Sequence, residues 1–377
     1  MKKFIYADNA ATTKLDSDAF EMMKPYLLSE YGNASQPYSF SRASKQALKN
    51  ARDIIARCIN ASPEEVYFTS CGTESDNWAL KGTCLPSKGK KLITSEIEHH
   101  AILNSAETLK KMGVEVDYLK PTNEGVITVD ELSKVITPKT TLVSVMLANN
   151  EIGTIQPVKD LTEMSHKFGA LFHTDAVQAV GHIKIDVKEL GIDMLSASAH
   201  KFNGPKGIGF IYIKQGTTIS AYLDGGSQES ALRAGTENVA SIVGMAYALK
   251  KNCEDLAVNK EKITKLEEYL LDLLNVCQSN NIRKNGGYNT LPGNISLSLK
   301  DQDGEALLHR LDLRGICVSA GSACDSKNTS VSHVLKAIHL DERYAKGTIR
   351  ISLGKDNTED DIRYIANELK KIINVKK

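Results

Sequence analysis

The sequence predicts an α/β protein with a large domain, built on a mostly parallel central sheet flanked by helices, and a smaller α+β domain. Apolar strand-like runs alternate with helical stretches between about residues 60 and 215, which is typical of βα units. A helical, heavily charged stretch follows over 239–276, and strand-like runs then return. We expect residues 15–255 to form the large domain, and residues 1–14 and 256–377 to form the small one.

Each element follows from a local pattern. Helical stretches such as 158–168 fill the gaps between the strands of the large domain. Short apolar runs predict those strands at 66–69, 91–94, 114–118, 141–146, 171–174, 194–197 and 209–213. In such sheets ligands collect at the carboxyl ends of the strands. Polar residues that follow different strands are therefore expected to meet there.

The second half contains three further clear elements. Residues 239–276 are expected to form one long connecting helix, and 294–299 and 348–353 are expected to be strands. Thr358 and Asp361 resemble a capping box at the start of a last helix. That helix has one apolar stripe, made of Ile362, Ile365, Ala366, Leu369, Ile372 and Ile373.

Composition restricts the function. The 377 residues are 41% hydrophobic and 25% charged, with a formal net charge of +1. This balance argues against non-specific binding of nucleic acids or anionic membranes, and favours small molecules or specific proteins as partners. No signal peptide or membrane span is visible. The seven cysteines are odd in number and lack a C-x-x-C pair. We therefore expect no disulfide framework, no metal site and a cytoplasmic location.

A lysine and an aspartate follow two different predicted strands. Lys201 ends the polar run 198–201, and Asp175 follows the strand at 171–174. Such a lysine can bind the aldehyde of pyridoxal phosphate, and the aspartate can pair with the protonated ring nitrogen so that the ring accepts electrons. A solvated lysine and a helix-capping aspartate are the alternatives. The apolar strand before Asp175 favours a half-buried carboxylate that needs a cationic partner.

Neighbouring polar residues suit the rest of that cofactor. Residues 70–77 follow a strand and open a helix, so they are either a phosphate cradle or a plain helix cap. Ser198 and His200 can donate to a phosphate. The amides of Asn150 and Gln178 suit the ring hydroxyl.

His99 could stack on the ring and shuttle protons. The alternative is that the pair His99–His100 is a surface feature. A two-histidine metal site lacks further ligands in this sequence.

Cys324 lies in the small, polar stretch 319–330, which has few apolar anchors and should be mobile. Most cysteines are buried, but one on such a loop is exposed: either an incidental thiol or a nucleophile that must enter a site and leave it carrying cargo. Asp325 follows it directly. We expect the Asp325 charge to disfavour the thiolate and raise the Cys324 pKa.

Together these residues resemble the cysteine desulfurases, pyridoxal-phosphate enzymes of the class V aminotransferase group with the type I transferase fold. The matching motifs cover nearly the whole chain, at 6–13, 72–77, 149–153, 173–178, 198–201, 233–236 and 349–354. The stretch 319–324 is similar to the NifS/IscS-like branch. One departure lies at 33–38, where relatives often carry a histidine and this chain has Tyr38.

The resemblance implies a role for each matching residue. Lys201 would hold the cofactor, Asp175 would pair with its ring nitrogen, and His99 would stack on it and serve as a base. Asn150 and Gln178 would contact the ring oxygen. The phosphate would lie among Gly72, Thr73, Ser198 and His200, with Thr236 reaching in from the second subunit of a homodimer. Arg350, and Asn150 again, would bind the substrate.

The implied reaction converts L-cysteine to L-alanine and leaves the sulfur as a persulfide on Cys324. An acceptor protein in iron–sulfur cluster assembly, or in tRNA or cofactor thiolation, would then receive it. Neither direct nucleic-acid binding nor a membrane is implied. A selenocysteine lyase or another class V aminotransferase would look similar. A non-catalytic sulfur carrier or regulatory partner is the alternative from a different class of protein.

Overall fold

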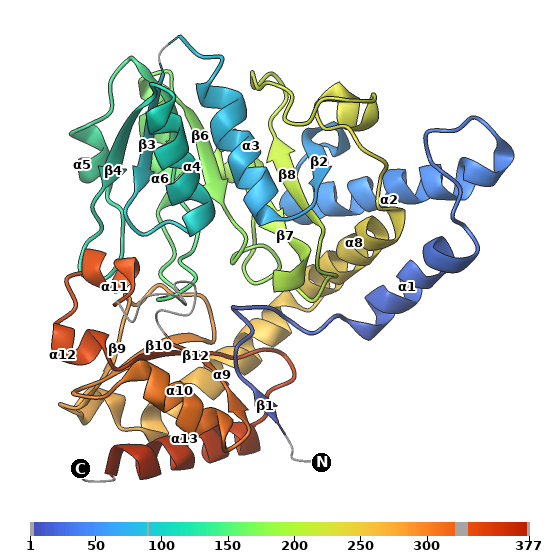
Figure 1. The fold of residues 1–377 in the computed structure, drawn as a ribbon. Helices are drawn as coiled ribbons and strands as arrows, with labels where there is room; N and C mark the ends of the chain where they lie inside the picture. Colours follow the sequence, from blue (N-terminus) through green and yellow to red (C-terminus); the bar gives the residue numbers. More distant parts are fainter. Residues whose placement is uncertain (1–3, 89, 321–330, 375–377) are drawn as a thin grey trace.

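The computed structural model describes residues 4–88, 90–320 and 331–374. It has two parts, each with its own sheet and hydrophobic core (Figure 1). We call the part built on the seven-stranded sheet the large domain, and the part built on the four-stranded sheet the small domain. The α/β architecture with flanking helices agrees with the fold class predicted from the sequence.

The large sheet is mostly parallel. Its strands follow the order β2 (Val66–Thr69), β8 (Gly209–Ile213), β7 (Met194–Ser198), β6 (Leu171–Asp175), β5 (Thr140–Ser144), β3 (Lys91–Ser95) and β4 (Glu115–Leu119). The run from β7 to β4 is parallel, whereas β8 is antiparallel to both of its neighbours. β2 therefore points the same way as this run, and the carboxyl ends of six strands lie at one edge of the sheet.

Helices cover both faces of this sheet, because successive side chains of a buried strand point to opposite faces. In β3, Leu92 packs into the core under α3 and α4, while Ile93 packs into the core on the other face. The helices of the large domain are α1 (Ser17–Leu28), α2 (Arg42–Ile59), α3 (Gly72–Cys84), α4 (His100–Lys111), α5 (Val129–Ser133), α6 (Val158–Lys167), α7 (Val187–Leu190) and α8 (Val239–Glu254).

The small domain packs helices against an antiparallel sheet. Its strands are β12 (Ser319–Ala320), β13 (Thr348–Ser352), β10 (Asn294–Leu299) and β9 (Ile282–Lys284), in that order, and its helices are α9 (Leu256–Leu273), α10 (Gly304–Asp312), α12 (Glu342–Ala345) and α13 (Glu359–Asn374). The short helix α11 (His333–Ala337) packs its buried Val334 and Leu335 into the core of the large domain. The capping box of α13 is confirmed. The Thr358 N–H donates to Asp361 Oδ2 at 3.0 Å, and the Asp361 N–H donates to Thr358 Oγ1 at 3.3 Å.

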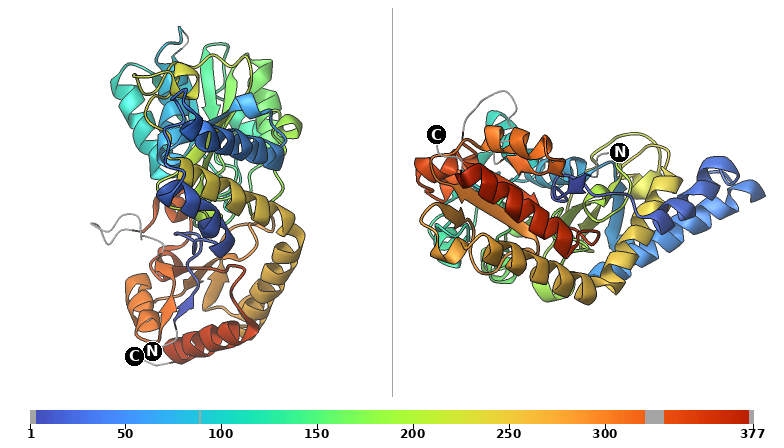
Figure 2. Two further views of the ribbon diagram at one scale, coloured as in Figure 1. Left: turned by 90° about the vertical axis from the view of Figure 1, so that its right-hand side faces the viewer. Right: turned by 90° about the horizontal axis from the view of Figure 1, so that it is seen from below.

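The single long helix expected over 239–276 is wrong. The segment forms two helices, α8 and α9, that meet at Asp255. Asp255 has φ −90° and ψ 5°, outside the helical range, so the chain changes direction there and α9 runs on into the small domain (Figure 2). The sequence gives no warning, because neither glycine nor proline marks the break.

The N-terminal segment joins the two domains. Its strand β1 (Ile5–Tyr6) pairs in parallel with β11 (Ile316–Cys317) of the small domain. The segment then passes beside β13, where Asp8 bridges Ser352, and Asp16 caps α1. Residues 7–15 therefore lie where the domains meet.

The described residues contain neither a membrane-spanning helix nor a metal-binding cluster. None of the described helices is both long and apolar enough to cross a membrane. No group of three or more His, Cys, Asp or Glu side chains in the described ranges is placed to hold a metal ion.

Candidate active site

Most of the predicted site residues line one cavity of about 420 Å³, where the carboxyl ends of the large-domain strands face the small domain. They come from segments far apart in the sequence: Gly72, Thr73, His99, Asn150, Asp175, Gln178, Ser198, His200, Lys201 and Arg350. Thr236 is exposed and does not line the cavity of this chain. Cys324 and Asp325 lie outside the described residues.

Lys201 ends a short 3₁₀ turn directly after β7. This turn carries its side chain to the N-terminal segment, where Nζ donates a hydrogen bond of 2.9 Å to the carbonyl of Ala11 and another to that of Ala10. Its own carbonyl accepts a 2.8 Å hydrogen bond from His182. The backbone of the lysine is thus fixed while its amine faces the cavity.

Asp175 is the last residue of β6 and is buried. The N–H of Val177 donates to its Oδ1 at 2.9 Å. Burial raises the pKa of this carboxyl, and the charges of His99 and Lys201 oppose the rise. A cation placed against the remaining oxygen would stabilise the carboxylate, and a protonated pyridine nitrogen is such a cation.

Two further acids lie close enough to Asp175 for its charge to raise their pKa values, and the sequence analysis did not single them out. Asp76 lines the cavity, and among the described residues its buried Oδ1 has no hydrogen-bond partner. Burial, with the nearby charge of Asp175, raises its pKa well above the usual value. Burial raises the pKa of Glu98 to about 8, although Ser95 donates to it at 2.5 Å. The sequence signal that could have identified both acids is that each comes shortly after a predicted apolar strand.

His99 caps α4, and the N–H of Ala101 donates to its Nδ1 at 3.1 Å. Because a backbone N–H can only donate, the proton of the neutral ring sits on Nε2. Burial lowers the His99 pKa, so the neutral ring prevails. His200 lines the same cavity, and burial lowers its pKa to about 4.

The start of α3 can hold a phosphate. Gly72 and Thr73 form its first turn, whose N–H groups have no partners within the helix. A Cβ added to Gly72 would lie 2.5 Å from Cγ2 of Val177. Glycine is therefore needed for close packing here. A Cβ on Gly72 would also lie 3.5 Å from Cβ of Ser198, and His200 lines the same cavity.

Arg350, in the middle of β13, brings the small domain into the site. Its Nη1 donates to the carbonyl of Asn150, and its Nη2 to Oδ1 of Asp8, both at 2.9 Å. Nη2 also lies 3.1 Å from Ser319 Oγ. Among the described residues the buried Nε has no partner. The guanidinium is thus fixed at the cavity wall with a donor to spare.

These residues fit pyridoxal phosphate. The amine of Lys201 matches the aldehyde, the carboxylate of Asp175 matches the ring nitrogen, and the α3 N-terminus matches the phosphate.

Comparison with known proteins agrees with this chemistry. The class V aminotransferase family matches residues 5–365. A cysteine desulfurase IscS of Dictyoglomus turgidum is 45% identical over 99% of this chain and 95% of its own length. The chain belongs to the class V aminotransferase family.

Further relatives indicate which activity within this family the chain has. A cysteine desulfurase IscS of Methanosarcina thermophila is 42% identical over 98% of this chain and 92% of its own. A NifS-like protein structure superimposes with a TM-score of 0.92, at 37% identity over 98% of this chain and 99% of that one. This member of the class V aminotransferase family is therefore a pyridoxal-phosphate-dependent cysteine desulfurase with the type I fold.

Proposed function

We propose that this desulfurase carries the sulfur of L-cysteine as a persulfide on Cys324 and passes it to an acceptor protein. One observation supports this above all. Ser319 and Ala320 line the same cavity as Lys201 and Arg350. Cys324 follows Ala320 closely, and four residues span at most about 14 Å. The chain therefore ties Cys324 closely to a residue of the cavity wall.

Lys201 and Asp175 would hold the cofactor as the sequence motif implies. When bound, the cofactor supplies an electron sink that stabilises negative charge at the substrate's α-carbon. Asp175 would keep the ring nitrogen protonated. Lys201 would also place an amine in the same cavity that can take the α-proton. Asn150 and Gln178 would contact the ring oxygen.

His99 would act as a proton donor in the resting tautomer. Its Nε2 carries the proton, because Nδ1 accepts from Ala101. To act as a base at Nε2, the role expected from the sequence, the ring would first have to give up that hydrogen bond. Donation from Nε2 suits the step that reprotonates the alanine fragment.

Arg350 would bind the carboxylate of cysteine. The cavity presents its guanidinium beside Asn150 and Ser319. A planar fork of this kind pairs with a carboxylate through two parallel hydrogen bonds.

The proposed unit is a homodimer. Gly72, Thr73, Ser198 and His200 would hold the cofactor phosphate together with the partner subunit's Thr236. Support comes from exposed apolar side chains on α1 and the loop after it, which we call the α1 patch: Phe20, Leu27, Leu28, Tyr31, Tyr38 and Phe40. A cluster of this kind on a monomer marks an interaction site.

Leu28→Glu tests the dimer. Leu28 is 77% exposed in the α1 patch, whereas Leu313, 73% exposed, lies on the small domain. Light scattering should give half the mass for Leu28→Glu and an unchanged mass for Leu313→Glu. If Leu28→Glu is still a dimer, the α1 patch is not the dimer interface.

The acceptor is proposed to be an iron–sulfur scaffold or a tRNA- or cofactor-thiolation enzyme, and the compartment the cytoplasm. A reducing compartment keeps a thiol carrier available.

Alanine release from L-cysteine, with reductant present, tests the function. Wild type should release alanine. Cys324→Ala should not, while its cofactor absorbance stays that of wild type. Equal alanine from both would show that another group accepts the sulfur. A faster reaction with selenocysteine than with cysteine would favour a selenocysteine lyase over a cysteine desulfurase.

A further inference from the structure

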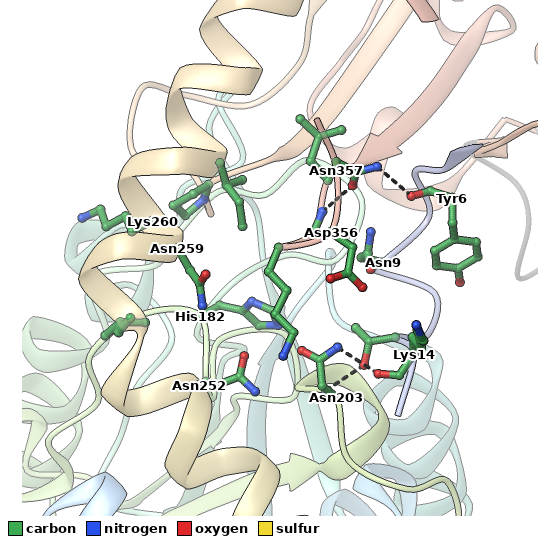
Figure 3. Close-up of a pocket in the computed structure, with 18 of the residues that line it drawn as sticks. Tyr6, Asn9, Lys14, His182, Asn203, Asn252, Asn259, Lys260, Asp356 and Asn357 are labelled. Carbon is green, nitrogen blue, oxygen red and sulfur yellow. Dashed lines mark hydrogen bonds between the residues drawn. The ribbon is translucent and has the colours of Figure 1, made fainter. Parts of the chain in front are cut away.

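A second cavity lies between the two domains, apart from the active site (Figure 3). Its volume is about 350 Å³, close to the 420 Å³ of the active-site cavity and within the range of small-molecule sites. The N-terminal segment 6–14, the α8–α9 junction and the loop 353–357 form its wall. Among the described residues, none lines both cavities.

Two buried asparagines on one side of this cavity have amide oxygens that lack a donor. Asn203 is 8% exposed, and its amide nitrogen donates to the carbonyl of Lys14 at 2.9 Å. Asn252 is 7% exposed, and its amide nitrogen donates to the carbonyl of Phe202 at 2.8 Å. These bonds orient both amides. In the described ranges no protein group donates to either Oδ1, so both oxygens can accept hydrogen bonds from the N–H or O–H groups of a ligand.

His182 adds a third acceptor. Its Nε2 donates to the carbonyl of Lys201 at 2.8 Å, and burial lowers its pKa, so the ring is neutral. The other ring nitrogen, Nδ1, is then an acceptor. The Asp356 carboxylate also lines the cavity, across from Asn203 (Figure 3). Acceptors of this number suit an ammonium group.

The rest of the wall suits a carboxylate and an apolar chain. Lys14 lines the cavity at the exposed rim, and no carboxylate of the described residues lies within ion-pair distance of its ammonium group. Leu256, Ile263 and Leu353 supply apolar surface. The cavity thus presents three kinds of surface to one small ligand.

We propose that this interdomain cavity is a second binding site, for a free α-amino acid with an apolar side chain. Its ammonium group would donate to the oxygens of Asn203 and Asn252, its carboxylate would face Lys14, and its side chain would pack on Leu256 and Ile263. The assignment is independent of the roles proposed for the active-site residues, because it shares no lining residue with that cavity.

A ligand bound in this cavity could affect the active site through His182. The ligand would contact both domains and lie beside His182, one hydrogen bond from the carbonyl of Lys201. Occupancy would hold the domains together and stabilise the folded enzyme, since a ligand that binds only the folded state raises the free energy of unfolding.

Asn259→Trp tests the site. Asn259 is half-buried on α9 and lines the cavity, so the indole would fill it. We would titrate cofactor-loaded enzyme with L-leucine by calorimetry. Wild type should bind one leucine per chain at this site, and Asn259→Trp should bind it at least about tenfold more weakly. Equal affinity in both proteins would overturn the proposal.

Val258→Trp is the matched control. Val258 is the neighbour of Asn259 on α9, is 71% exposed and does not line the cavity. It should bind leucine like wild type; a loss as large as in Asn259→Trp would overturn the proposal. Leucine entering the active site would change the cofactor absorbance equally in all three proteins, so the two sites are separable.

Two leucine analogues test the chemistry. Isopentylamine lacks the carboxylate and 4-methylpentanoate lacks the amino group, so both should bind wild type more weakly than leucine does. If 4-methylpentanoate binds as tightly as leucine, the amino-group assignment is wrong. If isopentylamine does, the role of Lys14 is wrong.

Discussion

Nη2 of Arg350 donates a 2.9 Å hydrogen bond to Oδ1 of Asp8, and the same oxygen accepts from Ser319 at 2.8 Å. Asp8 therefore fixes the position of the guanidinium and offsets its charge. A substrate carboxylate bound to Arg350 would be repelled by Asp8.

Asp8→Asn should separate these two effects. The amide oxygen can still accept from Arg350 and Ser319, but the negative charge is gone. We expect the KM for cysteine to fall about three- to tenfold, the scale of a partly exposed charge pair. Asp8→Ala, which also loses the positioning, should raise KM instead. Steady-state kinetics would measure both, and a higher KM in Asp8→Asn would contradict the charge argument.

Arg350→Lys should be a severe substitution. Lysine keeps the charge but loses the planar fork that hydrogen-bonds Asn150, Asp8 and the substrate. We expect kcat/KM for cysteine to fall about 10²-fold, since a hydrogen bond to a charged group contributes about 1.5–3 kcal/mol. Cofactor affinity, measured by absorbance, should stay near that of wild type. A large loss of cofactor would instead assign Arg350 a role in cofactor binding.

Gly72→Ala should weaken cofactor binding through crowding. The new methyl would lie 2.5 Å from Cγ2 of Val177, and overpacking of this kind costs about 1–3 kcal/mol. Part of that cost should appear as a higher cofactor dissociation constant. Combining Gly72→Ala with Val177→Ala should restore affinity, because the clashing atom is removed. An additive double mutant would show that the two sites do not interact.

Glu98→Gln should change how stability depends on pH. Burial raises the folded-state pKa of Glu98 to about 8, above its value of 4.5 in an unfolded chain. Between these values the folded state holds more protons than the unfolded state, so this group's stabilising contribution is present below pH 4.5 and is lost as pH rises toward 8. Urea unfolding at pH 5.5 and 7.5 should show a smaller loss for Glu98→Gln than for wild type. If both proteins lose the same free energy of unfolding between these two pH values, Glu98 is ionised in the folded protein.

Much of the fold could be predicted because its strands are strongly patterned. The strands at 66–69, 209–213 and 294–299 have the bounds that the sequence predicted. The two-residue strands β1 and β11 could not be predicted, because two residues give no period and their pairing joins distant parts of the chain.

Part of the candidate active site could likewise be predicted from the sequence, and part could not. Lys201 and Asp175 could be predicted because each follows an apolar strand, and the sheet brings their loops together. The tautomer of His99 could not, because it depends on a contact made only in the folded chain, with Ala101. The state of Asp76 depends likewise on burial beside Asp175.

The pairing of Asp8 with Arg350 joins residues 342 positions apart. During synthesis the ribosome produces the loops carrying His99, Asp175 and Lys201 long before it reaches Arg350. The half of the site that would hold the cofactor can thus be translated and begin to fold while the half that would hold the substrate does not yet exist. A nascent chain would then acquire its cofactor before it could act on the cell's free cysteine.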